Sequence, residues 1–286
     1  MNIYDQDPTG DNYRLVRCKQ CGLEWIEDPV ARQDIFKHYP TDNSPYAAEL
    51  GESIPLVKRF LFWLDARLLL KHLKPGDLVM DVGAGLGTFG SYLRWRGLNV
   101  IAADFIDAKK WPRKNIPYVQ VDLNAPSLSF DKLKACLGDQ IPKAVVIRHV
   151  LEHVFEPERL ISFLSDLKPQ YILVIVPNGG SWLRWLFGKH WGFFDPPRHL
   201  SNFRKESLRC LFQRAGYKSF EFNSYGMDET VVSIYRLGRG WSPKIRKWFS
   251  WTSKAMLISS ALSLLPGRSV LVVLASGRDH NARSSG

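Results

Sequence analysis

The chain has 286 residues, and its 39 Lys and Arg residues against 28 Asp and Glu residues give a formal net charge of +11. Hydrophobic residues make up 45% and charged residues 23%, which is average for a globular protein and excludes wholesale disorder. The most apolar long stretch, 255–275, is interrupted by Pro266, Gly267 and Arg268, so we expect no transmembrane helix. The polar start MNIYDQDPTGDNYR lacks the basic and apolar parts of a secretory signal, and we expect a cytoplasmic protein.

Three segments differ in character, and each is an expected domain. Residues 1–54 are polar and rich in turn residues, residues 55–225 alternate between strand and helix patterns, and residues 226–286 are basic and rich in tryptophan.

The first segment contains a Cys-x-x-Cys-Gly turn formed by Cys18 and Cys21. Such a turn lets two thiolates converge on one metal ion. Zinc needs four ligands, and His38 is the only nearby residue that could add one, so a metal-free turn is favoured over a zinc site. Cys136 and Cys210 are spaced singly and are expected to be buried within helices.

The second segment opens with a predicted amphipathic helix, which runs from Pro55 to a Pro-Gly stop at 75–76. Short apolar runs then recur at regular intervals and predict strands at 78–82, 99–104, 118–122, 143–147 and 170–177. Helical or loop sequence separates these runs, an alternation that predicts a parallel sheet with helices on both faces. The pattern continues with a predicted helix at 206–217 and predicted strands at 218–224 and 269–276.

A glycine-rich turn follows the first predicted strand and reads Asp81-Val82-Gly83-Ala84-Gly85-Leu86-Gly87. Gly83 and Gly85 allow bare backbone to approach a ligand, and Gly87 begins a helix whose N-terminus can receive polar groups. The dinucleotide-binding fingerprint, Gly-x-Gly-x-x-Gly, differs in spacing, and a pyrophosphate would fit poorly beside the Asp81 carboxylate. An acid at this place suits a ligand that carries an ammonium group.

Two more acids follow the next predicted strands. Asp104 lies about twenty residues beyond Gly83, where a carboxylate can accept both hydroxyls of a ribose. Asp122 ends the third predicted strand. Three acids at the carboxyl ends of successive strands describe a crevice for a positively charged nucleoside without phosphate, and S-adenosylmethionine fits this description.

From about Leu73 to Tyr225 the chain resembles a class I S-adenosylmethionine-dependent methyltransferase. The resemblance is carried by VMDVGAGLGTFG, IAADF, VQVDLN, RHVLEHVFEP and DPPRHLSNF. It implies an α/β fold with a doubly wound, seven-stranded, mostly parallel Rossmann-like sheet whose last strand is antiparallel. The chain is most similar to the subgroup with Leu-Glu-His and Pro-Arg-His-Leu motifs, which acts on sugars, quinones and other small molecules. An α/β fold without a cofactor is the alternative.

The resemblance also implies places for the cofactor. It puts Gly83, Gly85 and Gly87 under the methionine part, Asp104 on the ribose and Asp122 beside the adenine. The Cys18 turn resembles the second half of a zinc ribbon that precedes some methyltransferases of this subgroup, but the first cysteine pair is absent here.

Methyl transfer to oxygen or nitrogen requires alignment and the removal of one proton, for which histidine is the usual side chain. Arg148 and His149 follow the fourth predicted strand, where we expect contacts with cofactor or substrate. His199 is our candidate general base, and Arg198 beside it offers a cation to an acidic substrate. The alternative is that His199 only pins its turn, and we expect His153 to hold its loop rather than to catalyse.

An aromatic segment, residues 179–197, lies between the fifth predicted strand and the Pro-Pro turn. Its glycines and large rings are typical of a lid or an acceptor pocket, which we favour, although packing in the core explains them too.

The third segment concentrates the positive charge. Between Arg236 and Arg283 nine basic residues face one acid, Asp279. In the stretch 241–265 an apolar stripe with interleaved Lys and Arg suits a helix in a membrane interface, and equally a helix packed on its own domain. Nucleic-acid binding ranks below both, because no RNA-binding module accompanies the charge.

The sequence therefore predicts an S-adenosylmethionine-dependent methyltransferase with a small-molecule, sugar or lipid-linked glycan acceptor, cytoplasmic or peripheral at the inner membrane through an anionic surface. The alternatives are an RNA methyltransferase and a non-catalytic cofactor-binding adaptor at the membrane.

Overall fold

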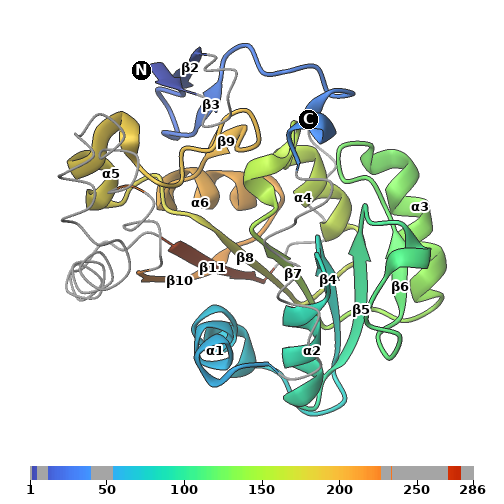
Figure 1. The fold of residues 1–286 in the computed structure, drawn as a ribbon. Helices are drawn as coiled ribbons and strands as arrows, with labels where there is room; N and C mark the ends of the chain where they lie inside the picture. Colours follow the sequence, from blue (N-terminus) through green and yellow to red (C-terminus); the bar gives the residue numbers. More distant parts are fainter. Residues whose placement is uncertain (1, 5–11, 40–53, 227–232, 234–269, 278–286) are drawn as a thin grey trace. The chain divides into compact units, whose positions relative to one another are not determined.

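The computed structural model describes residues 2–4, 12–39, 54–226, 233 and 270–277 (Figure 1). The chain divides into two compact units, which we describe separately. The first combines Tyr39–Ile175, Arg209–Phe222 and Val272–Gly286, and the second combines Met1–His38, Val176–Leu208 and Asn223–Leu271. Both units are discontinuous in sequence.

The described residues form helices, short 3-10 turns and two sheets. The helices are α1 (Leu56–Leu70), α2 (Thr88–Trp95), α3 (Pro126–Leu137), α4 (Pro157–Ser165), α5 (Trp182–Phe187) and α6 (Lys205–Arg214). The 3-10 turns are η1 (Ile35–His38), η3 (Ala108–Lys110), η4 (Leu151–His153) and η5 (Gly188–His190). The large sheet contains β4 (Leu78–Val82), β5 (Asn99–Asp104), β6 (Tyr118–Gln120), β7 (Ala144–Arg148), β8 (Tyr171–Pro177), β10 (Ser219–Tyr225) and β11 (Val270–Ser276). The small sheet contains β1 (Asn2–Tyr4), β2 (Asn12–Arg17), β3 (Glu24–Ile26) and β9 (Ser201–Asn202).

The large sheet is doubly wound and confirms the predicted fold class. Its order is β10-β11-β8-β7-β4-β5-β6, and β4 pairs in parallel with both β5 and β7. The strand order therefore reverses at β4, with β5 and β6 on one side and β7 and β8 on the other (Figure 1). In open α/β sheets ligands bind outside the carboxyl ends of the strands at such a switch point.

The reversal of strand order also determines which face of the sheet each helix covers. The α2 crossover runs from β4 to β5, whereas α3 and α4 join strands in the opposite direction along the sheet. Because such crossovers are right-handed, α2 must cover one face and α3 and α4 the other. The contacts agree, since α1 packs on α2 and α3 packs on α4.

Most predicted strands appear within a residue of their expected bounds, because long apolar runs mark buried parallel strands. β6 is the exception, since it ends at Gln120 rather than at Asp122. The Asp122 carboxylate accepts the Asn124 N–H at 2.8 Å and so turns the chain away from the sheet.

The small sheet has its own apolar core. Tyr13, Leu15 and Ile26 of its first strands pack with four buried side chains of the aromatic segment, namely Leu183, Phe187, Trp191 and Phe194. Core packing, the less favoured alternative, therefore accounts for these side chains. Trp185 is different, because it is 85% exposed.

Two further expectations concern cysteines and the tail. Cys136 and Cys210 lie on α3 and α6 as predicted, but Cys136 is exposed, so its expected burial is wrong. The stretch 241–265 lies outside the described residues. Among the described helices none is long and apolar enough to cross a membrane.

Candidate functional site

The glycine turn connects β4 to α2 at the switch point of the sheet. Gly83, Gly85 and Gly87 all have positive φ, at 76°, 55° and 70°. A Cβ on Gly83 would lie 2.1 Å from Cγ2 of Val150, so this position excludes any larger residue. A Cβ on Gly85 would meet no atom of the described chain within 4 Å. Bare backbone therefore lines open space at Gly85, as a bound nucleoside requires.

Asp104 is the last residue of β5, and its carboxylate faces this turn. It is only 4% exposed. Oδ2 accepts the Gly85 N–H at 2.8 Å, and Oδ1 accepts the Ile106 N–H at 3.3 Å. Burial raises the pKa of Asp104 to about 6, although these N–H groups oppose the rise. The Phe105 N–H also stabilises this carboxylate. An ionised carboxylate has about four acceptor positions, so Asp104 keeps capacity for a ligand hydroxyl.

Asp81 lies inside β4, one strand away from Asp104, and is 1% exposed. Burial raises its pKa to about 7 and the Asp104 charge adds to the rise, whereas the Arg148 guanidinium and the backbone N–H of Gly90 oppose it. Oδ2 of Asp81 is buried and accepts no hydrogen bond from the described residues. A buried acceptor without a donor calls for a cation or an N–H donor, which agrees with the predicted ammonium group.

Arg148 ends β7 next to Asp81, but its guanidinium is already engaged. Nε donates to Oδ2 of Asp65 at 2.7 Å, and Asp65 is fully buried on α1. The guanidinium also lies over the rings of Phe62 and Phe89, at 5.1 and 5.5 Å. This clamp fixes Arg148 as the counter-charge of Asp81, a role that the sequence prediction of a direct cofactor contact did not include.

Asp122 lies two residues beyond β6 and is exposed. One of its oxygens caps the turn through Asn124, as described above. The other remains available at the edge of the sheet where the resemblance places the adenine.

Sequence reasoning missed the loop that follows Asp104. Trp111 of this loop is buried and stacks on Tyr118, with ring centroids 4.2 Å apart. The Tyr118 hydroxyl donates to the Asp104 carbonyl at 2.8 Å, and Arg113 Nε donates to the Leu86 carbonyl at 3.1 Å. A Cβ on Gly87 would lie 2.7 Å from the Trp111 ring. The loop thus closes on the glycine turn, and the only signal in the sequence was an isolated tryptophan.

His149 follows β7 directly and has a φ of 52°, in the left-handed region that few non-glycine residues adopt. Nδ1 of His149 lies 3.5 Å from Oε1 of the buried Glu152. Strained backbone of this kind is concentrated at functional sites, which supports the choice of His149. Nδ1 of His153 lies 3.1 Å from the Tyr39 hydroxyl.

His199 and Arg198 belong to the second unit. Nδ1 of His199 lies 2.8 Å from the Phe193 carbonyl, which can only accept, so the neutral ring carries its proton on Nδ1 and its lone pair on Nε2. Nη2 of Arg198 pairs with the Asp195 carboxylate at 2.7 and 2.9 Å. His199 therefore pins its turn and at the same time has the tautomer that a general base requires. The charge of Arg198 is largely compensated.

The cysteine turn joins β2 to β3. Cys18 N–H donates to the Leu23 carbonyl at 2.8 Å, and Gly22 N–H donates to the Cys18 carbonyl at 3.0 Å. Within the described residues no third metal-ligating side chain clusters with Cys18 and Cys21. This part of the chain therefore offers a metal two thiols, whereas structural zinc sites have four ligands.

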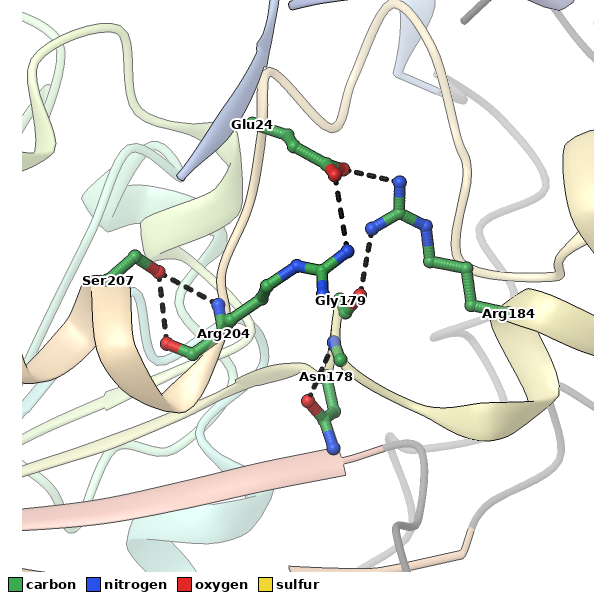
Figure 2. Close-up of polar contacts among 7 residues, drawn as sticks. Glu24, Asn178, Gly179, Arg184, Arg204 and Ser207 are labelled. Carbon is green, nitrogen blue, oxygen red and sulfur yellow. Dashed lines mark hydrogen bonds and ion pairs between the residues drawn. The ribbon is translucent and has the colours of Figure 1, made fainter. Parts of the chain in front are cut away.

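A salt-bridge cluster that the sequence did not suggest is formed at Glu24, which follows this turn in the chain. Glu24 of β3 is buried between Arg184 of α5 and Arg204, which precedes α6 (Figure 2). Arg204 Nη2 lies 3.3 Å from Glu24 Oε1, Arg184 Nη2 pairs with Glu24 Oε2, and Arg184 Nη1 donates to the Gly179 carbonyl at 2.8 Å. Arg184 and Arg204 lie about 160 and 180 residues beyond Glu24 in the chain. No local sequence pattern therefore predicts the cluster.

Comparison with known proteins finds one family model and several solved structures that are similar to this chain. A family model for the methyltransferase domain matches residues 57–221. The structure is similar to that of a SAM-dependent methyltransferase from Archaeoglobus fulgidus, with 18% identity, a TM-score of 0.51, and 77% of this chain and 94% of that chain covered. It is also similar to Haemonchus contortus phosphoethanolamine N-methyltransferase 2 in complex with S-adenosyl-L-methionine, with 14% identity, a TM-score of 0.51, and 90% and 62% covered.

At these identities the structural likeness concerns the fold alone. No curated protein matches the sequence. The family model, however, spans more than half of the chain and contains the glycine turn and Asp104. The chain therefore belongs to the methyltransferase domain family.

Proposed function

We propose that the chain transfers a methyl group from S-adenosylmethionine to a small-molecule acceptor. The observation that carries the proposal is the pairing of the Gly85 N–H with the Asp104 carboxylate, at the carboxyl ends of β4 and β5 beside open space. This arrangement suits a ribose with a cationic side chain. A structural relative was solved with the same cofactor, which supports the choice.

The residues present fit this cofactor. Gly83, Gly85 and Gly87 would underlie its methionine part, and Asp104 would accept a ribose hydroxyl. Asp81 provides a buried carboxylate for the ammonium group, with Arg148 as its fixed counter-charge. Asp122 would lie beside the adenine. When bound, the cofactor supplies a methyl group that is already activated by the sulfonium charge.

Binding of S-adenosylhomocysteine tests this proposal by calorimetry. Replacing Asp104 by Ala removes the acceptor of this hydroxyl, and we expect the affinity to fall roughly tenfold to a hundredfold. Asp107→Ala is a suitable control, because the Asp107 carboxylate only caps η3 through the Lys109 N–H at 2.9 Å. Protein that binds NAD and ignores S-adenosylhomocysteine would contradict the assignment.

Two glycines provide a second, stricter comparison. Gly85 and Gly138 have nearly the same φ, 55° and 56°, and a Cβ on either meets no described atom within 4 Å. Alanine is therefore strained at both positions, because φ is positive at each, whatever the space around it. We expect Gly85→Ala to lose S-adenosylhomocysteine binding and Gly138→Ala to retain it. Equal loss would mean that strain, not ligand contact, explains the effect.

We propose that His199 is the general base and that its Nε2 removes the proton from the acceptor. With an acceptor in hand, His199→Ala should lower turnover by roughly 10²–10⁴ while cofactor affinity stays unchanged. His190→Ala, on the same segment, is the control. An unaffected rate would leave His199 with its structural role in the turn.

The acceptor class is tested by transfer of a labelled methyl group. The panel contains free sugars, lipid-linked glycans and RNA. Label in a sugar or a lipid-linked glycan supports the small-molecule proposal. Label in RNA alone would replace it by an RNA methyltransferase, and binding of the cofactor without any transfer would favour an adaptor.

A further inference from the structure

The cysteine turn faces an open cavity of about 530 Å³ within the second unit. Its lining includes three cationic side chains, Arg17, Lys19 and Arg204, one carboxylate, Glu206, and the two thiols. A volume of this size is typical of sites for small organic ligands. All of its lining residues belong to the second unit and none belongs to the glycine turn, so it is not needed to explain cofactor binding.

The charges around the cavity do not balance. Arg204 also reaches Glu24, which pairs with Arg184 as well (Figure 2). Together, Arg17, Lys19, Arg184 and Arg204 are four cations, and Glu24 and Glu206 are two anions. Burial lowers the pKa of Arg184, Glu24 opposes this, and the nearby charges of Arg204 and Arg17 lower it further.

Three observations describe where the surplus charge lies. Nε of Arg204 is buried and has no acceptor among the described residues. Arg17 and Lys19 are exposed, and no described carboxylate forms an ion pair with either. Arg17 also bends over the cysteine turn, since its Nη2 lies 3.4 Å from where a Cβ on Gly22 would be. Buried donors and unpaired guanidinium groups are the features that bind planar or tetrahedral oxyanions.

We propose that this cavity binds a phosphate group through Arg17, Lys19 and Arg204, and that a small phosphorylated organic molecule carries it. A phosphate group alone would fill only a fraction of the cavity, which favours an ester. A nucleic acid would need a longer basic track, whereas the described cations converge on one cavity. The proposal does not depend on methyl transfer.

Calorimetry with glucose 6-phosphate, inorganic phosphate and glucose tests the proposal, in the presence of a chelator so that no metal bridges the thiols. We expect glucose 6-phosphate to bind, inorganic phosphate to bind more weakly, and glucose not to bind. Arg17→Gln and Lys19→Gln should each weaken glucose 6-phosphate binding about tenfold, the usual effect of one charge-assisted contact. Both side chains are exposed, so the fold should persist, whereas Arg204 also holds Glu24 and is a poor test.

Arg14→Gln is the matched control, because Arg14 lies on the same strand, is exposed, and pairs with Glu27 outside the cavity. It should bind glucose 6-phosphate as the parent protein does. Unchanged affinity in the Arg17 and Lys19 variants, or no binding of any phosphate, would overturn the proposal. Equal affinity for inorganic phosphate would mean that the cavity binds a phosphate group but does not recognise the organic part of the ester. Binding of polyuridylate alone would assign the cavity to nucleic acid instead.

Thiol reactivity gives an independent readout. Glucose 6-phosphate in the cavity should slow the alkylation of Cys18 and Cys21 by iodoacetamide at least severalfold, as measured by peptide mass spectrometry. Cys136 is exposed on α3 and provides an internal reference that should not change. Equal slowing at all three cysteines would mean that the ligand does not act at this cavity.

Discussion

Asp81 shows how one buried side chain can make ligand binding depend on pH. Burial raises its pKa to about 7, so Asp81 changes between its neutral and ionised forms near neutral pH. A ligand with an ammonium group prefers the ionised form. Its affinity should therefore fall as the pH drops below 7, by up to about tenfold per unit, and level off above pH 8. Calorimetry with S-adenosylhomocysteine between pH 6 and 8 measures this slope.

The Asp81→Asn variant should bind weakly and show a flatter slope. Asp77→Asn is the control, because the Asp77 carboxylate is half-buried, lies outside the glycine turn and accepts the Lys74 N–H at 2.8 Å. A parent-like slope in the Asp81 variant would mean that another group, such as Asp104, controls the pH dependence.

The stability of the ligand-free fold should depend on pH in the opposite direction to the ligand affinity. Asp81 and Asp104 have higher pKa values in the folded chain than the ordinary value of 3.8, so the folded state holds more protons than the unfolded state between about pH 4 and 7. Stability should therefore fall as the pH rises through this window. We expect Asp81→Asn to unfold at a higher temperature than the parent protein at pH 7.5, and at a similar one near pH 4. A lower unfolding temperature at pH 7.5 would contradict the raised pKa.

At the scale of elements, the salt-bridge cluster at Glu24 ties β3 to the segment that contains α5 and to the start of α6 (Figure 2). Glu24→Gln removes the one buried charge of the cluster and leaves Arg184, whose side chain is 12% exposed, without a counter-ion. Breaking a buried pair in this way costs about 3–5 kcal/mol, and we expect a loss of that size in the free energy of unfolding, measured by denaturant titration.

Glu27→Gln is the matched control for this prediction. Glu27 follows the same strand and pairs with Arg14, but that arginine is 65% exposed. Surface pairs of this kind contribute about 0–1 kcal/mol. If the two variants were destabilised equally, the cluster at Glu24 would not be a special support of the small sheet.

The same strand shows why part of the fold could not be predicted. In Glu24–Ile26 the acid and the isoleucine point inward, whereas Trp25 is 39% exposed. Hydropathy alone favours the reverse, with the tryptophan buried. The counter-charges that reverse this order come from arginines far along the chain, and period-two patterns carry no information about them.

The large sheet was predictable for the opposite reason. β4 and β5 are buried on both faces, so each appears in the sequence as one apolar run, and both match their expected bounds. The glycine turn and Asp104 were predictable because a ligand imposes spacing on them. Trp111 was not, because it acts through a contact with Gly87 that only the folded loop creates.

At the scale of the whole molecule, the charge is unevenly distributed. Nine basic residues and one acid between Arg236 and Arg283 account for most of the net charge of +11. The stretch 241–265 in this region combines lysine and arginine with three tryptophans. This composition suits reversible attachment to an anionic membrane, where each basic residue contributes about 1 kcal/mol and salt weakens the attraction.

Liposome sedimentation tests this attachment. The full chain should bind vesicles that contain phosphatidylserine, bind neutral vesicles much less, and dissociate as salt is added. Replacing Lys244, Arg246 and Lys247 by alanine should lower the affinity by about 3 kcal/mol, on the order of a hundredfold. The matched control is the triple alanine variant of Lys109, Lys110 and Lys114, which removes the same charge from exposed positions elsewhere. Because both variants change the net charge equally, only an effect of local charge separates them. Equal losses in the two variants would mean that net charge alone explains the attraction to the membrane. Parent-like binding of both variants would exclude an electrostatic contribution from the tail.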